Sequence, residues 1–107
     1  MPSQKSFTHP DLADVSVSQA MQALADPSRV AIISALSTDP SREFACNEIH
    51  LDIELSKATV SHHFKTLREA GIILTRVEGR NCLSSIRREE FTQRFPGLLE
   101  LVLSECS

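Results

Sequence analysis

One short segment near the middle of the chain restricts the fold more than any other. Ser56 is a residue type that caps helices, because its hydroxyl accepts a hydrogen bond from a free amide of the first turn. Val60, Phe64 and Leu67 follow at helical spacing. Gly71 then stands where a left-handed C-terminal cap is favoured. The pattern predicts a short helix with a single apolar face that packs against a core.

The opposite face of this predicted helix has no acidic side chain. Its members are small, polar or basic: Lys57, Ala58, Ser61, His62, Lys65 and Arg68. A single carboxylate among them would repel phosphate, so the absence of carboxylates favours contact with a polyanion. A helix fits the major groove of duplex DNA, where its first turn presents side chains to base edges.

The segments around this helix predict a recognisable order of elements. Residues 72–77 and 82–86 are rich in β-branched and apolar side chains, and the turn at 78–81 joins them into a β-hairpin with a basic tip. Upstream, residues 44–51 predict a short helix and 52–55 a tight turn. Two short helices, the second with a polar and basic outer face, followed by a hairpin indicate a winged helix-turn-helix.

Two further helices are expected in the first part of the chain. The first begins near residue 14 and has one apolar face, formed by Val17, Ala20, Met21 and Leu24. Asp26 suits the N-cap of the second helix and Pro27 its first position. Residues 30–36 are apolar almost all round, which predicts the most buried helix of the protein.

The end of the chain predicts more helix. One apolar stripe contains Phe91, Phe95, Leu98, Leu99, Val102 and Leu103. Pro96 and Gly97 interrupt it, so we expect either two short helices or one helix with a sharp break. The expected fold is therefore mainly α with a small β-hairpin: four helices, two strands and a last helix. Residues 1–13 are expected to form a flexible arm, and residues 14–107 one winged helix-turn-helix domain for DNA binding and dimerisation.

Charge is distributed unevenly along the 107 residues, a length that suits one domain. The whole chain has a net charge of −3. Residues 57–88, however, contain seven basic and two acidic side chains, a net of +5, which leaves −8 for the rest. Such segregation is typical of a face that binds a polyanion, although an ordinary solvated helix and hairpin remain an alternative.

Several classes of protein are not expected. No apolar run approaches the roughly 18 residues that a membrane span needs. The first residues contain no apolar signal core, and three widely spaced cysteines do not form a disulfide framework. We therefore expect a cytoplasmic protein with reduced thiols and no membrane partner. We do not expect an enzyme, because there is no glycine-rich phosphate loop and no motif that activates a nucleophile.

Three runs of this sequence closely resemble the ArsR/SmtB family of bacterial repressors. They are Ala-Leu-Ala-Asp-Pro-Ser-Arg at 23–29, the capped helix at 56–71, and Glu-Gly-Arg at 78–80. The resemblance covers about residues 15–103. It implies a homodimer with five or six helices and a wing, which represses a promoter until an inducer binds. It does not imply which inducer.

With this resemblance, ten residues become candidates for contact with double-stranded DNA. Ser56 is expected to cap the helix and contact phosphate. Base edges are expected to be read by Lys57, Thr59, Ser61 and His62. His63 and Lys65 are expected to reach either the bases or the DNA backbone. Phosphate or minor-groove contacts are expected from Arg68, Arg76 and Arg80. The alternative for the two histidines is a surface polar pair, with His63 packed partly against the wing.

A second set of residues is expected to join two copies of the chain. The first helix and the C-terminal stripe offer more hydrophobic surface than one small core can hide, and family dimers pair these elements. The candidates are Val17, Met21, Phe95, Leu98, Leu99, Val102 and Leu103. A two-fold symmetric dimer predicts a near-palindromic operator.

Neither metal site of the family is expected here, and we expect no cofactor. The resemblance places the family's Cys-x-Cys positions on Ala45 and Asn47, with Cys46 between them. The family's other site needs a histidine on the last helix, and this last helix has none. The inducer is therefore unknown.

Two alternatives stay open. The first is a thiol-based metal or redox sensor of the same fold, which would use Cys46 together with His50 or Cys106. Cys82 lies on a predicted strand, where it is expected to pack or to face the wing surface. The second alternative is a winged helix that binds another protein and does not bind DNA.

Overall fold

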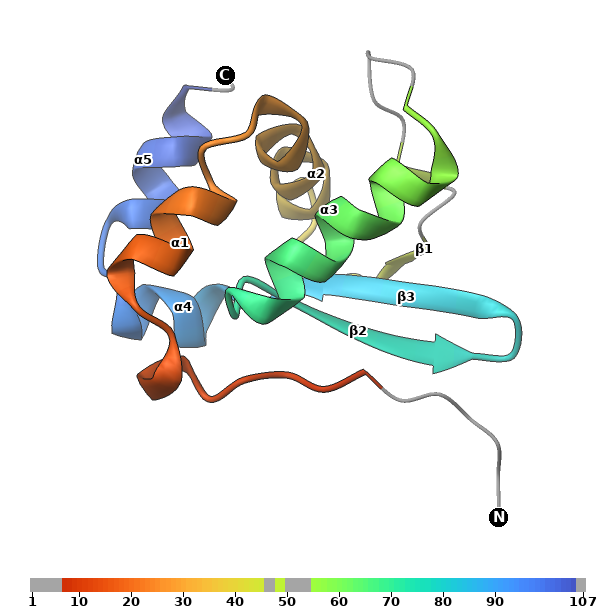
Figure 1. Ribbon diagram of the computed structural model, residues 1–107, viewed down its shortest axis with the longest axis horizontal. Helices are drawn as coiled ribbons and strands as arrows, with labels where there is room; N and C mark the ends of the chain where they lie inside the picture. Colours follow the sequence, from red (N-terminus) through yellow and green to blue (C-terminus); the bar gives the residue numbers. More distant parts are fainter. Residues whose placement is uncertain (1–6, 46–47, 50–54, 106–107) are drawn as a thin grey trace.

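A computed structural model describes residues 7–45, 48–49 and 55–105 of the chain. The elements in order are the 3-10 helix η1 (Leu12–Asp14), α1 (Val17–Ala23), α2 (Pro27–Ser37), β1 (Phe44–Ala45), α3 (Lys57–Glu69), β2 (Ile73–Glu78), β3 (Asn81–Ile86), α4 (Arg88–Arg94) and α5 (Leu98–Ser104). In Figure 1 the hairpin of β2 and β3 extends to one side, while α1, α4 and α5 gather at the other. The predicted class, mainly helical with a small β-sheet, is confirmed.

The start of α2 follows the predicted capping pattern. The Asp26 carboxylate accepts hydrogen bonds from the amides of Ser28, at 2.7 Å, and Arg29, at 3.4 Å. Burial alone would raise the pKa of Asp26, but these two amides and the charges of Arg29 and His63 together outweigh it and hold that pKa below its ordinary value. Pro27 occupies the first helical position, where the missing N–H has no consequence. The interior of the helix is completely buried at Ile32, Ile33 and Leu36, as predicted.

Helix α3 also begins at the predicted residue. The Ser56 hydroxyl accepts a hydrogen bond from the Thr59 amide at 3.1 Å. Phe64 and Leu67 are buried in the core, and Val60 is half-buried against it. The apolar face predicted from the spacing is therefore the face that anchors the helix.

A glycine ends α3 for two separate reasons. Gly71 has a φ of +75°, in the left-handed region that favours glycine. A Cβ atom at this position would also lie only 2.9 Å from Cδ1 of Leu12. The close approach lets the chain leave the helix and enter β2 directly over the N-terminal segment.

The antiparallel sheet has the strand order β1-β3-β2. Pairing in the hairpin runs from Ile73 opposite Ile86 to Glu78 opposite Asn81. The predicted helix at 44–51 is wrong at its start, because residues 44 and 45 form strand β1 against β3. This pairing buries Phe44 and uses the backbone groups of β3 that the hairpin leaves open. Most of the rest of that segment, and of the turn predicted after it, lies outside the described residues.

The C-terminal stripe forms two short helices, one of the two predicted forms. Gly97, with a φ of +81°, separates α4 from α5. Phe91 and Leu99 are completely buried and Phe95 nearly so. These three side chains close the core beneath α2, to which α5 is packed.

The described part of the predicted N-terminal arm lies against the domain. Leu12 and Val15 are buried, and their carbonyl oxygens accept hydrogen bonds from the Arg94 guanidinium of α4 at 3.1 and 3.0 Å. In Figure 1 the segment continues along the outer edge of the hairpin. Residues 7–13 therefore contact the domain through His9, Pro10 and Leu12, and residues 1–6 lie outside the described part.

Candidate nucleic-acid interface

The outer face of α3 gathers most of the predicted DNA contacts on one exposed surface. Because the opposite face is anchored in the core, these side chains point to solvent: Ser56, Lys57, Ala58, Thr59, Ser61, His62 and Lys65. The first turn has no acidic side chain, and the carboxylate of α3, Glu69, lies at the other end of the helix. Among the residues that the structure describes, no carboxylate bonds to the positive pole of the helix N-terminus, where Lys57 also lies, so a phosphate is favoured there.

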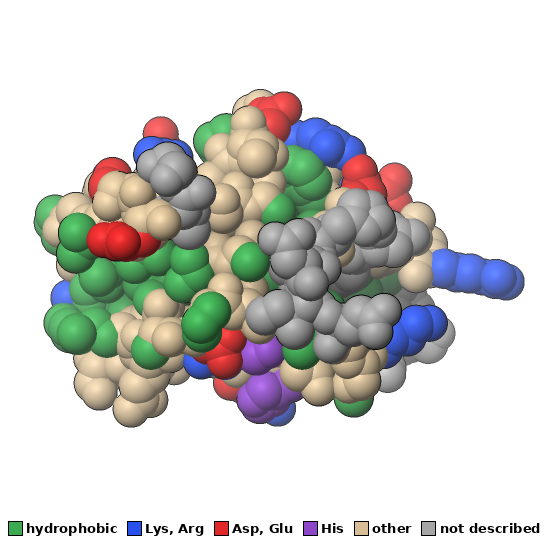
Figure 2. Space-filling model, turned by 90° about the horizontal axis from the view of Figure 1, so that it is seen from above, with side chains coloured by type: hydrophobic (Ala, Val, Ile, Leu, Met, Phe, Trp, Pro, Cys, Tyr) green, Lys and Arg blue, Asp and Glu red, His purple; other side chains and the backbone are tan. Residues whose placement is uncertain are grey.

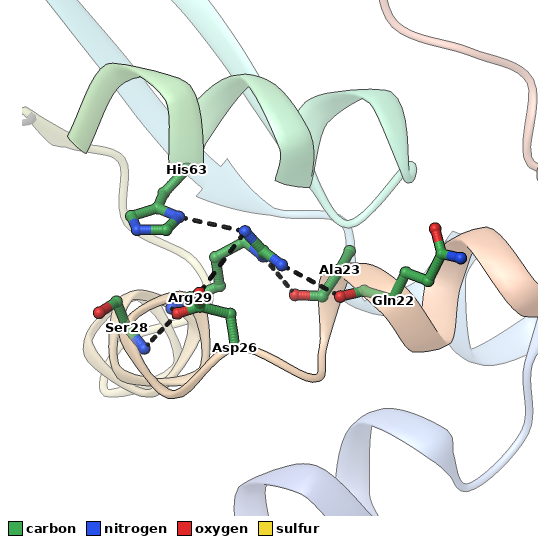
Figure 3. A network of polar contacts seen from close by, with 6 residues as sticks. All are labelled: Gln22, Ala23, Asp26, Ser28, Arg29 and His63. Carbon is green, nitrogen blue, oxygen red and sulfur yellow. Dashed lines mark hydrogen bonds and ion pairs between the residues drawn. The ribbon is translucent and has the colours of Figure 1, made fainter. Parts of the chain in front are cut away.

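The two neighbouring histidines differ in position. His62 is exposed on the outer face, whereas His63 is only 7% exposed. The Nδ1 atom of His63 lies 3.2 Å from Nη1 of Arg29 on α2, as Figure 3 shows. The His63 side chain therefore faces the interior between α2 and α3, unlike the exposed side chains predicted to contact DNA. The polar partner of His63 is on α2, whereas the alternative expected packing partly against the wing.

Arg29 connects three elements behind the recognition face (Figure 3). Its Nε donates to the Ala23 carbonyl at 2.7 Å and its Nη2 to the Gln22 carbonyl at 3.1 Å, at the end of α1. A guanidinium only donates hydrogen bonds, so the unprotonated Nδ1 of His63 must be the acceptor. The sequence places Arg29 in a family-like run, but nothing in its spacing predicts this contact with α3.

The two predicted wing arginines are in different environments. Arg80 is exposed at the hairpin tip beside Gly79. Arg76 donates two hydrogen bonds to the Glu43 carboxylate, at 2.6 and 2.7 Å, and forms an ion pair with Glu78 at 2.8 Å. The bonds from Arg76 hold the pKa of the Glu43 carboxyl below its ordinary value. Arg76 therefore has two carboxylate partners, and Glu43 is a neighbour that sequence analysis missed.

Other basic side chains of segment 57–88 are also engaged within the protein. Arg68 lies over the Phe7 ring, 4.1 Å from its centroid. Arg87 is buried, pairs with Glu90 at 2.7 Å and donates to the Pro10 carbonyl at 3.0 Å. The net charge of this segment therefore overstates the charge that is available to a polyanion.

The residues predicted at a dimer interface fall into three groups by exposure. Phe95 and Leu99 lie in the core of the chain itself and expose almost no surface. Val17 and Met21 are 50% and 56% exposed, and Leu101, which sequence analysis missed, is 64% exposed. The half-buried members are Leu98, Val102 and Leu103. Figure 2 shows hydrophobic side chains gathered at the end of the molecule where Figure 1 places α1 and α5.

The thiol alternatives fall mostly outside the described residues. Cys46, His50 and Cys106 all belong to the undescribed segments. Cys82 is a half-buried free thiol on β3. Within residues 7–45, 48–49 and 55–105, no three His, Cys, Asp or Glu side chains are grouped as a metal ion requires. In the same ranges, no helix has the length and apolar character needed to cross a bilayer.

Known proteins resemble this chain in both sequence and fold. The profile of the family described as "Bacterial regulatory protein, arsR family" matches residues 26–75. The HTH-type transcriptional regulator YceK of Bacillus subtilis is 43% identical over 82 residues, which are 77% of this chain and 81% of that protein. The chain belongs to the ArsR family. It is a DNA-binding transcriptional regulator with a winged-helix fold.

Solved structures agree with this assignment. The crystal structure of the ArsR family transcriptional regulator RHA00566 has a TM-score of 0.64 at 27% identity and covers 85% of this chain and 97% of that one. The transcriptional repressor BigR of Xylella fastidiosa has a TM-score of 0.62 at 22% identity, over 85% and 86% of the two chains. The second likeness is in fold alone.

Proposed function

We propose that this ArsR-family regulator is a homodimeric repressor that binds near-palindromic duplex DNA and releases it when an inducer binds. The observation that carries the proposal is the exposed outer face of α3, which has no acidic side chain in its first turn. Such a face enters the major groove without repelling phosphate. A repressor also stands among the proteins of the same fold.

The contacts are divided between base edges and the DNA backbone. Base edges are read by Lys57, Thr59, Ser61 and His62. Ser56 at the helix N-terminus, Lys65 on the outer face and Arg80 at the wing tip contact phosphates, which position the protein more than they select a sequence. Arg76 and Arg68 act within the protein, since each already has a partner in its own chain.

The dimer forms through the exposed apolar side chains of α1 and α5. Val17, Met21 and Leu101 are the most exposed of them. Pairing these surfaces in two copies removes apolar area from water and places two α3 helices in successive major grooves, about 34–36 Å apart. A single domain over residues 14–107 both binds DNA and forms the dimer. The protein acts in the cytoplasm, catalyses no reaction and needs no membrane partner or cofactor.

The inducer is proposed to be neither a metal ion nor an oxidant. Both metal sites of the family lack ligands in this sequence, since Ala45 and Asn47 replace the Cys-x-Cys pair and the last helix has no histidine. A variant in which Cys46, Cys82 and Cys106 are all serine is expected to bind and release DNA like the native chain. Gel-shift assays with zinc, copper, arsenite and a peroxide test this. Release of only the native protein by one of these agents would contradict it.

Selection of DNA from a random duplex library tests the main proposal. The native chain is expected to enrich a sequence with two-fold symmetry and to sediment as a dimer. Binding to the selected duplex should weaken steeply with salt, because each phosphate contact releases counterions. A selected site without symmetry, or a monomer at micromolar concentration, would contradict the dimeric repressor. Binding to no duplex at all would instead support a protein-interaction module.

A further inference from the structure

Residues 7–15, which we call the N-terminal strap, are fastened at one end to α4. Two arginines donate to backbone carbonyls of the strap: Arg94 to Leu12 and Val15, at 3.1 and 3.0 Å, and Arg87 to Pro10, at 3.0 Å. A guanidinium donor strengthens each of these bonds. Residues 10–15 of the strap are therefore held in place by α4 and by Arg87 just before it.

The other end of the strap contacts both DNA-binding elements. The His9 Nε2 atom accepts a hydrogen bond from the Thr75 amide of β2 at 2.9 Å. Because β2 is an edge strand, this buried amide would otherwise lack a partner in the sheet. The Phe7 ring lies beneath the Arg68 guanidinium of α3. Two neighbouring side chains of the strap thus hold the wing and the recognition helix.

A small cavity lies where these three parts meet. It has a volume of about 130 Å³ and is lined by Val60 and Phe64 of α3, Thr75 and Cys82 of the wing, and Phe7 of the strap. Direct packing of α3 against the hairpin therefore leaves space at this point. Phe7 forms one wall of that space, so its ring restricts the orientation of the hairpin relative to α3.

We infer that the strap is a positioning element for DNA recognition: Phe7 and His9 set the orientation of the hairpin relative to α3. The inference rests on the proposed function of the outer face of α3. Neither side chain is expected to contact DNA. Loss of either should therefore weaken binding to a sequence that needs both elements in register, and should leave binding to random duplex nearly unchanged.

His9 makes this device sensitive to pH. Only a neutral imidazole accepts the Thr75 amide. Burial, and then the charges of Arg87 and Arg68, lower the pKa of His9 below its ordinary value of 6.5. Arg87 faces it from the start of α4, paired with Glu90, and Arg68 faces it from α3. The bond is at full strength above pH 6.5 and is lost as the pH falls below 6.5 through the lowered pKa.

Variants of three adjacent residues test the inference on duplex selected by the native chain. Phe7→Ala and His9→Ala are expected to bind this duplex about five- to tenfold more weakly, with random duplex affected less than about twofold. Thr8→Ala is the matched control, because Thr8 is exposed between them, and it should bind like the native chain. His9→Gln supplies an amide oxygen as acceptor and should restore binding at neutral pH.

Measurements at lower pH separate positioning from general stability. Below pH 6.5 the native chain should lose affinity relative to His9→Gln, whose side chain does not titrate. If circular dichroism shows that Phe7→Ala is unfolded, the comparison of His9→Ala with His9→Gln still tests whether an acceptor at position 9 is needed for binding. Equal losses on selected and random duplex, native-like binding by both alanine variants, or an equal loss in Thr8→Ala would overturn the inference. If the native chain selects no duplex, the proposed function fails instead.

Discussion

The outer face of α3 and the flank of the wing both contain basic side chains, but those charges are held differently. Lys57 and Lys65 project from α3 and form no ion pair with any other residue that the structure describes. Arg76 on β2 lies between Glu43 and Glu78 and bonds to both. Three basic residues that look equivalent in the sequence therefore differ in the charge that they can present to DNA.

The difference shows why a charge count along a segment is a poor measure of a binding surface. On α3 the helical repeat alone decides which side chains share a face, so the absence of carboxylates is visible in the sequence. In the wing, the decisive carboxylate comes from Glu43, which is 33 residues away from Arg76 in the chain. An arginine so paired acts as a brace, and its bonds would have to break before it could bind phosphate.

The largest expected effect comes from placing a carboxylate on the outer face of α3. Ala58→Glu should lower affinity for the selected duplex by about 100-fold, because like charges brought together at an interface cost several kcal/mol. The same change should not destabilise the fold, since a carboxylate near a helix N-terminus is favourable. Ala58→Gln is the control of equal size. Equal affinities of the two variants, measured by fluorescence anisotropy, would remove α3 from the interface.

Truncation of a lysine on the same face should cost less and should change sequence preference. Lys57→Ala is expected to lose roughly 1–3 kcal/mol of binding free energy, with relaxed preference at one operator position. Titration against selected duplexes that each contain a single base-pair change would detect this. A uniform loss across all these duplexes would mean that Lys57 contacts only phosphate.

The wing tip should differ from α3 in kind. Arg80→Ala is expected to weaken binding to every duplex alike and to reduce the slope of log affinity against log salt by about one. Affinities at several salt concentrations, on selected and random duplex, measure that slope. An unchanged slope would show that Arg80 does not reach phosphate.

The smallest effect is expected at the braced arginine. Arg76→Ala should change DNA affinity by less than about threefold, and Glu43→Gln should raise it slightly, because the guanidinium is then less neutralised. Since the pKa of Glu43 is lowered from 4.5, the brace persists at neutral pH and is lost only as the pH falls below 4.5 through that lowered value. A loss in Arg76→Ala as large as that in Arg80→Ala would contradict this division of the wing.

The sequence predicted the local elements of the fold well. Asp26 and Ser56 cap the helices that the sequence predicts to begin at them, and Gly71 has the expected left-handed conformation. Each of these features depends on a few adjacent residues, so a short pattern is sufficient to predict it. The prediction of helix at Phe44 was wrong because pairing with β3, nearly forty residues later in the chain, outweighs local preference.

Contacts between distant segments explain the remaining differences. His63 is adjacent to an exposed histidine, yet Arg29 on another helix holds it inside. Leu99 belongs to an apolar stripe that supplies both core and surface, and spacing along a short broken helix does not separate the two. The strap contains a proline and several polar residues, a composition typical of a free arm, but Arg87 and Arg94 donate hydrogen bonds to its backbone carbonyls. Every residue has a backbone carbonyl, so the sequence does not show which carbonyls accept these hydrogen bonds.

By itself, the sequence determined the winged-helix class, the family, and the outer face of α3, because helix caps and helical periodicity are local properties. Tertiary structure alone decided which basic side chains remain available, which apolar side chains are left for a partner, and where the N-terminal segment docks. Those outcomes depend on which residues meet after folding. Ion pairs such as Arg76 with Glu43, and hydrogen bonds such as His9 with the Thr75 amide, join segments whose separation in the chain has no periodic signal.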